Sequence, residues 1–90
     1  MKTTKVTIKS LSESSTPNES EKCGTLIKNL YAAIACPANE FGNLKFSVIK
    51  HNHHKATIIV CYEFSSDYFA FEEYFYRYYA DKFTWREKCI

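Results

Sequence analysis

The chain has 90 residues, of which 46% are hydrophobic and 24% charged, and a formal net charge of +2. This length allows one domain with a thin core, and so small a charge does not by itself indicate a nucleic-acid binder. With only two glycines, the chain has little of the flexible backbone that nucleotide and cofactor enzymes place against their ligands, so we expect no cofactor.

The cysteines and the apolar segments bear on the compartment. Cys23, Cys36, Cys61 and Cys89 show no C-x-x-C spacing, and the polar start of the chain, MKTTK, lacks the character of a signal peptide. No apolar run approaches the roughly 18 residues of a membrane span. We therefore expect a cytoplasmic protein with reduced thiols and no membrane contact, with disulfides as the alternative.

The first two elements are a strand and a helix. Residues 4–11 alternate polar and apolar side chains, which predicts a half-buried strand, and residues 12–16 read as a polar loop. The segment Thr16–Glu19, with the sequence TPNE, predicts a helix start with threonine as N-cap and proline at the first helical position. The helix should end before Pro37. Its apolar stripe is Cys23, Leu26, Ile27, Leu30, Tyr31 and Ile34.

Two further strands are predicted at residues 44–49 and 56–64, where apolar and polar residues again alternate. One register gathers their apolar side chains on a single face, and a slip of one residue scatters them. This register pairs Leu44 with Tyr62, Phe46 with Val60 and Val48 with Ile58. It predicts a three-residue loop, Asn52-His53-His54, with one residue in the left-handed region.

Residues 67–83 form the second predicted helix, capped by Ser65-Ser66-Asp67. Residues 84–90 either fray or form a short fourth strand. The order β-α-β-β-α, with an optional last strand, predicts a split βαβ, ferredoxin-like α+β sandwich. We expect a single domain over residues 1–90, an antiparallel sheet and both helices on one face of it.

Nine of the sixteen residues from Tyr68 to Phe83 are aromatic, which is more than one core-facing stripe can use. On a helical wheel, one side is assigned to the core: Tyr68, Phe71, Tyr74, Phe75 and Tyr78. The other flank is assigned to a protein partner: Phe69, Glu72, Tyr76, Tyr79 and Phe83. A carboxylate on this flank argues against deep burial, and exposed aromatic residues are typical of interfaces. The alternative is that the first helix covers the flank.

Candidate catalytic and metal-binding groups do not form a set. His51, His53 and His54 lie in one predicted turn without further ligands, and they indicate a solvated loop rather than a zinc site. Glu72 and Glu73 point about 100° apart on a helix, which suits neither acid nor base catalysis as a pair. We expect no enzymatic activity, no catalytic residue and no metal.

Nucleic-acid binding is the main rival to protein binding. Ferredoxin-like sheets include the RRM domain, which stacks bases on aromatic side chains of its sheet. The outer sheet face here should carry Lys5, Lys9 and Lys45 but no aromatic platform, which leaves contacts to phosphate alone. The alternative is that these lysines protect the sheet from aggregation.

Taken together, these features predict a small non-enzymatic domain that binds another protein through the acidic, aromatic helix at residues 67–83. Ten lysines against two arginines, with many Asn, Ile, Phe and Tyr, are typical of AT-rich genomes. A phage or mobile-element inhibitor that sterically occludes a host protein is the most concrete form of this prediction. The alternatives are a nucleic-acid module with a lysine-bearing sheet and a homodimeric structural protein.

Overall fold

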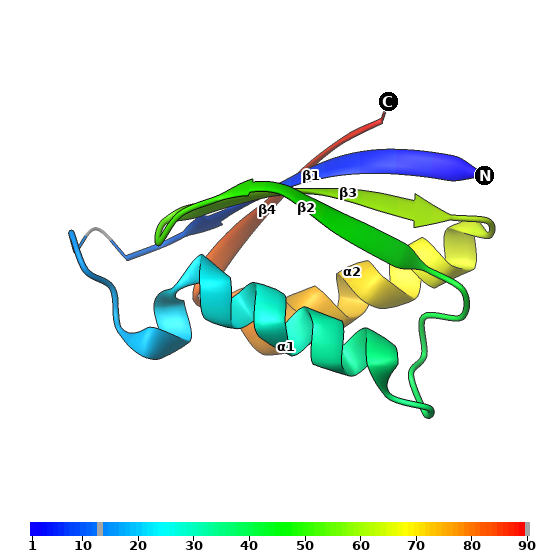
Figure 1. Ribbon diagram of the computed structural model, residues 1–90, viewed down its shortest axis with the longest axis horizontal. Helices are drawn as coiled ribbons and strands as arrows, with labels where there is room; N and C mark the ends of the chain where they lie inside the picture. Colours follow the sequence, from blue (N-terminus) through cyan, green and yellow to red (C-terminus); the bar gives the residue numbers. More distant parts are fainter. Residues whose placement is uncertain (13, 90) are drawn as a thin grey trace.

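The computed structural model describes residues 1–12 and 14–89, and it shows a sheet covered on one face by two helices (Figure 1). Its elements in chain order are β1 (Lys2–Ser10), a 3-10 turn η1 (Glu19–Glu21), α1 (Cys23–Ala35), β2 (Lys45–His51), β3 (Lys55–Tyr62), α2 (Ser65–Tyr79) and β4 (Phe83–Cys89). This confirms the predicted ferredoxin-like sandwich. The C-terminal segment forms a fourth strand rather than a frayed end.

The sheet has the order β2-β3-β1-β4, and all neighbouring strands are antiparallel. β1 and β3 are therefore central, and β2 and β4 are the edges. Ile8 lies opposite Ala56 of β3 on one side and Trp85 of β4 on the other. Because side chains that pair across neighbouring strands lie on the same face, one face of the sheet is apolar and the other is mainly polar.

One core lies between the apolar face and the helices. Its sheet side contains Val6, Ile8, Leu44, Phe46, Ala56, Ile58, Val60 and Tyr62, all of them buried. α1 contributes Leu26 and Leu30, and α2 contributes Phe71 and Phe75. The Phe75 and Trp85 rings lie 4.7 Å apart between centroids, so α2 also packs against the edge strand β4.

The predicted start of the first helix at Thr16 is wrong. The Glu21 N–H donates to the Asn18 carbonyl at 2.8 Å, the Asn18 N–H donates to Glu21 Oε2 at 3.2 Å, and these bonds close a 3-10 turn instead. Lys22 then has extended dihedral angles (φ −82°, ψ 135°), so α1 begins only at Cys23. Pro17 is buried rather than placed in the first turn of the helix. The predicted end before Pro37 is confirmed.

The predicted register of the β2–β3 hairpin is confirmed, but the predicted loop is wrong. Phe46 pairs with Val60 and Val48 with Ile58. A bulge between Val48 and Lys50 then shifts the pairing, and His53-His54 form a two-residue turn closed by a bond from the Asn52 N–H to the Lys55 carbonyl at 2.9 Å. The extra residue of the bulge corrects the side-chain parity that a two-residue turn would otherwise upset. Among the described residues, only glycine has a positive φ.

Both ends of α2 also differ from the prediction. Phe64 occupies the N-cap position, and no side chain bonds the free N–H groups there, so the predicted cap by Ser65-Ser66-Asp67 is wrong. The helix ends at Tyr79 instead of Phe83. The Lys82 N–H donates to the Tyr79 carbonyl at 2.9 Å in the turn that leads into β4. Phe83 therefore belongs to a strand, and this changes the surface that α2 presents.

Candidate functional site

The predicted partner flank is only partly exposed. Phe69 and Tyr76 are 61% and 50% exposed, and Glu72 and Tyr79 are half-buried. Phe83 is only 2% exposed, because as the first residue of β4 it enters the core. Its assignment to the flank is therefore wrong.

The side of α2 assigned to the core is also only partly buried. Tyr68, Phe71 and Phe75 are buried, and Tyr74 is half-buried against Phe41, with ring centroids 5.4 Å apart. Tyr78 is 53% exposed, so its assignment to the core is wrong. The excess of aromatic residues on α2 is thus divided between two separate surfaces.

A small acidic and aromatic surface remains where α2 borders β4, and we call Phe69, Glu72, Tyr76 and Glu87 the α2–β4 patch. The Tyr68 hydroxyl donates a hydrogen bond to Glu87, and the Tyr76 ring lies 6.4 Å from that of Trp85. Burial is the main cause that raises the pKa of Glu72. A hydrogen bond to Glu87 and the negative charge of Glu87 raise it further. The patch therefore combines exposed rings with a carboxyl group, that of Glu72, whose ionisation is disfavoured by burial and by the neighbouring Glu87.

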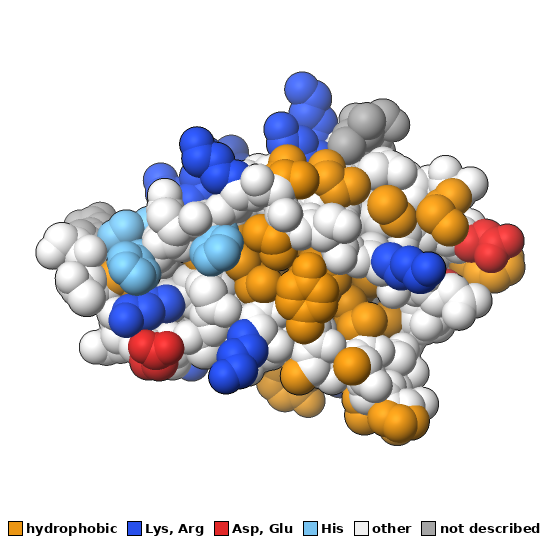
Figure 2. Space-filling view, in the orientation of Figure 1, with side chains coloured by type: hydrophobic (Ala, Val, Ile, Leu, Met, Phe, Trp, Pro, Cys, Tyr) orange, Lys and Arg blue, Asp and Glu red, His pale blue; other side chains and the backbone are white. Residues whose placement is uncertain are grey.

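The opposite surface of the molecule is strongly cationic. The outer face of the sheet, which no helix covers, carries seven exposed side chains that we call the basic face: Lys5, Lys9, Lys45, Lys50, Lys55, Arg86 and Lys88. In Figure 2, which has the orientation of Figure 1, lysine and arginine side chains project from the upper edge, where the sheet lies. The predicted residues Lys5, Lys9 and Lys45 do share this face.

The other four cations of the basic face were missed by sequence reasoning, each for an identifiable reason. Arg86 and Lys88 alternate with Trp85 and Glu87, but this signal becomes useful only once residues 83–89 are known to form a strand. Lys50 faces outward because of the bulge. Lys55 was missed because the predicted strand began one residue later, at Ala56, whereas β3 begins at Lys55. A bulge and the exact start of a strand are set by tertiary packing, which one sequence does not reveal.

Register arranges these cations in successive rows across the sheet. Lys9 lies directly opposite Lys55, and Lys5 directly opposite Lys88. Arg86 and Lys50 occupy the two ends of a third row, joined through Thr7 and Thr57. Lys45 begins a fourth row. Each of the four rows therefore contains at least one cation.

Within the part of the chain that the structure describes, no strand places an acidic side chain on the basic face. Glu87 pairs with Val6 on the opposite face, and Glu63 follows the end of β3. Between the cations lie threonines, Ser47, Ile59 and Cys61, and no aromatic ring. This surface can attract and hold phosphate groups, but it offers nothing on which a base could stack.

The basic face is hollowed at the end nearest the β2–β3 turn. A depression of about 130 Å³ is lined by Lys50, Asn52, Lys55 and Thr57. A larger one of about 530 Å³ is lined by Lys9, Ser10, Leu11, Ser12, His54, Thr84 and Arg86. Each hollow lies beside two of the seven cations and contains hydroxyl or amide groups that suit an oxyanion.

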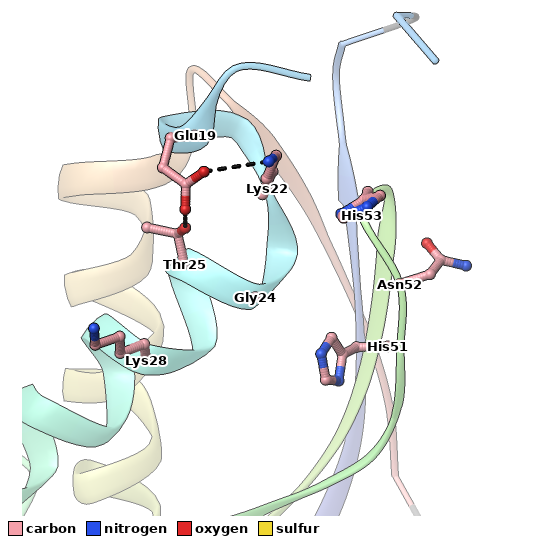
Figure 3. A pocket seen from close by; sticks show the side chains of 8 residues that line it. All are labelled: Glu19, Lys22, Gly24, Thr25, Lys28, His51, Asn52 and His53. Atoms are coloured by element: carbon pink, nitrogen blue, oxygen red, sulfur yellow. Dashed lines mark hydrogen bonds and ion pairs between the residues drawn. The ribbon is translucent and has the colours of Figure 1, made fainter. Parts of the chain in front are cut away.

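His51 and His53 belong to a different surface. They lie on the helix side of the hairpin, beside the start of α1, and line an open hollow of about 470 Å³ (Figure 3). Its other lining residues are Glu19, Lys22, Gly24, Thr25, Lys28 and Asn52. Glu19 is engaged there by Thr25 at 2.9 Å and Lys22 at 3.2 Å, and these contacts lower its pKa. Among the side chains that the structure describes, those of residues 1–12 and 14–88, no three His, Cys, Asp or Glu are placed to share a metal ion.

The three cysteines whose side chains the structure describes differ in their surroundings, and only Cys61 lies on the basic face. Cys23, Cys36 and Cys61 are free thiols, the first buried, the second exposed and the third half-buried on the sheet. Burial raises the pKa of Cys23 to about 11, which makes it a structural rather than a reactive thiol. The side chain of Cys89 lies outside the described part of the structure.

Comparisons with protein-family models, curated proteins and solved structures found no match. Neither α1 nor α2 has the length and the hydrophobicity to cross a bilayer, in the part of the chain that the structure covers. The two surfaces above are therefore interpreted from their own chemistry.

Proposed function

We propose that the protein binds nucleic acid through the basic face, by contacts to phosphate. The observation that carries this proposal is the gathering of seven cations on one uncovered sheet face whose strands place no carboxylate among them, including the facing pairs Lys9–Lys55 and Lys5–Lys88. Like charges directly opposite each other destabilise a sheet. A polyanionic ligand relieves this repulsion, so the arrangement favours binding at the expense of stability.

Protection against aggregation explains only part of this pattern. Cations on edge strands discourage sheets from pairing with one another, and this accounts for the lysines of β2 and the two cations of β4. Lys5, Lys9 and Lys55 lie on the central strands β1 and β3, which already have partners on both sides. An edge-protecting role does not require them.

Phosphate contacts imply affinity that depends steeply on salt and little on base sequence. Each neutralised phosphate releases counterions, so log K falls by about 0.9 per contact for each tenfold rise in salt on a duplex. With several contacts, affinity should drop by roughly three orders of magnitude or more between 50 and 200 mM salt. Binding of this kind is consistent with the cytoplasmic location expected from the sequence, which stays a prediction.

The test is fluorescence anisotropy with labelled DNA and RNA of arbitrary sequence across this salt range. Lys5→Gln/Lys9→Gln should weaken binding by roughly 60-fold, because each of the two lost contacts removes about eightfold in affinity at 0.1 M salt. The matched control is Lys28→Gln/Arg77→Gln, which removes the same charge from the exposed faces of the helices and should change affinity little.

Three outcomes would overturn the proposal. The protein could bind no nucleic acid at low salt, or the two double variants could lose affinity equally, which would indicate a net-charge effect. Binding to vesicles of anionic lipid without binding to nucleic acid would assign the basic face to a membrane surface instead.

A second candidate function is docking of a protein on the α2–β4 patch, favoured by the exposed rings of Phe69 and Tyr76 beside Glu72. The carboxylates suit a basic partner, such as a host protein that a phage inhibitor would occlude. The alternative partner is a second copy of the chain. Phe69→Ala/Tyr76→Ala should abolish capture of the partner, or dimerisation measured by light scattering, while the melting temperature stays nearly unchanged. A large loss of thermal stability with unaltered assembly would show that these rings serve only the fold.

A further inference from the structure

We infer that the preferred ligand is a nucleic-acid duplex, held by the phosphates of both of its strands. This inference rests on the proposed function and adds the form of nucleic acid to it. Three features carry it: what lies between the cations, how widely the cations are spread, and where the surface is hollowed.

The first feature is the absence of rings from the basic face. Proteins that bind single strands gain much of their affinity from bases stacked on aromatic side chains. Here the rings of the sheet, such as Phe46, Tyr62 and Trp85, all face the core. A single strand would therefore meet cations but would leave its bases unstacked, and it would lose the main advantage that it has over a duplex.

The second feature is the width of the charged surface. Lys50 on β2 and Arg86 on β4 mark opposite edges of one row, three strand spacings or roughly 14 Å apart. The Lys9–Lys55 pair lies on the two strands between them, one row away. A single backbone follows one line of phosphates and leaves part of this width unused. A B-form DNA duplex presents two backbones separated by grooves of about 6 and 12 Å, which is the scale of the basic face.

The third feature is the placement of the two hollows. One lies beside Lys50 and Lys55, the other beside Lys9 and Arg86. They fall on the two halves of the sheet, over β2–β3 and over β1–β4, so that their centres are separated by about two strand spacings, or roughly 10 Å. Each hollow therefore provides two cations for binding the phosphates of one of the two strands of the duplex.

Hydrogen bonding prepares the smaller hollow for an anion. Asn52 Oδ1 accepts bonds from the N–H groups of His54 at 2.8 Å and Lys55 at 3.0 Å. This fixes the amide so that its NH2 group remains available as a donor. Figure 3 shows the Asn52 side chain pointing away from α1, whereas His51 lies on the α1 side. Asn52 borders the hollows on both sides of the turn, and it lines the smaller one together with Lys50, Lys55 and Thr57.

The experiment compares a short labelled duplex with each of its separated strands at 50 and 200 mM salt. We expect the duplex to bind at least tenfold more tightly at the lower salt and to show the steeper dependence, since the slope per contact is about 0.9 for duplexes and 0.7 for single strands. Lys50→Gln/Arg86→Gln, which removes one cation from each edge, should reduce duplex affinity by a larger factor than single-strand affinity. The helix-side variant Lys28→Gln/Arg77→Gln serves again as the control for charge.

The possible results test the preference for a duplex and the proposed nucleic-acid binding separately. Single strands that bind as tightly as the duplex, or an edge variant that affects both ligands equally, would overturn the preference for a duplex and leave nucleic-acid binding intact. If neither ligand binds, the proposed function itself fails, and the duplex preference fails with it.

Discussion

Gly24 and Gly42 are the two glycines of the chain, and the structure gives them opposite roles. Gly24 lies in the first turn of α1, and a Cβ added there would meet no atom within 4 Å. Gly42 has φ +60°, and a Cβ there would lie 2.5 Å from Asp67 Oδ1. We predict that Gly24→Ala raises the free energy of unfolding by about 0.5–1 kcal/mol and that Gly42→Ala lowers it by more than that. Urea denaturation of both variants measures the two effects, and the reverse order would contradict the assigned backbone conformations.

Glu72 provides a second prediction at this scale. Its pKa is raised from an ordinary value of 4.5 by burial first and by Glu87 second. Between 4.5 and the raised value, the folded state binds a proton that the unfolded chain has released, so stability increases as the pH falls through this window. Above the window, ionised Glu72 destabilises the fold. Glu72→Gln should therefore raise the melting temperature at pH 7.5 and have little effect at pH 4.

The control for Glu72 is its neighbour. Glu73 is exposed and pairs with Arg77 at 3.2 Å, so Glu73→Gln should leave thermal stability nearly unchanged or slightly lower it at neutral pH. If Glu72→Gln destabilised the protein at pH 7.5, the carboxylate would be a favourable part of the α2–β4 patch in the isolated chain, and the assigned sign would be wrong.

At the scale of a strand pair, the facing lysines of β1 and β3 allow stability and binding to be separated. Replacing Lys9 by Glu converts the Lys9–Lys55 pair into opposite charges, which should contribute about 0.2–1 kcal/mol to stability. The same change places a carboxylate in the middle of the basic face, so nucleic-acid affinity should fall by well over tenfold. Thermal unfolding and anisotropy on the same Lys9→Glu preparation measure both effects. Lys9→Gln should lie between the wild type and Lys9→Glu in both thermal stability and affinity. A loss of thermal stability in Lys9→Glu would show that Lys9 supports the fold.

The limits of sequence reasoning also lie at this scale. Alternation in β1 and β3 was enough to predict the core positions and the hairpin register, because apolar burial allows only one of two parities. It could not locate the end of α2, since the helical pattern of aromatic residues continues past Tyr79 into Phe83. The turn at Ala80–Lys82 is decided by the pairing of β4 with β1, a contact between the two ends of the chain.

The same long-range pairing decides which surface becomes the candidate site. Without β4, the outer face carries five lysines, of which sequence reasoning predicted three. With β4 in place, Arg86 and Lys88 join it, and Lys88 comes to face Lys5. The full basic face therefore forms only when the strands pair. The aromatic helix was evident from the sequence, but folding buries part of the surface that the sequence predicted to be exposed.

For the whole molecule, the small net charge conceals a strong separation of charge. The seven cations of the basic face contribute +7, so the remaining residues together carry −5 to give the total of +2. Glu72, Glu73 and Glu87 belong to this acidic remainder and lie away from the outer face of the sheet. A particle that is basic on one side and acidic on another attracts its own copies head to tail, and such contacts do not close into a symmetric dimer.

This separation predicts self-association that salt suppresses. Light scattering at about 10 mM salt should show attraction that grows with protein concentration. The attraction should vanish near 150 mM, where the Debye length falls to about 8 Å. Lys5→Gln/Lys9→Gln should weaken the attraction at low salt, whereas Phe69→Ala/Tyr76→Ala should leave it largely intact. A dimer of fixed mass that persists at high salt and is lost in the Phe69/Tyr76 variant would instead place an apolar homodimer interface on α2, and it would favour protein association over phosphate binding as the role of this chain.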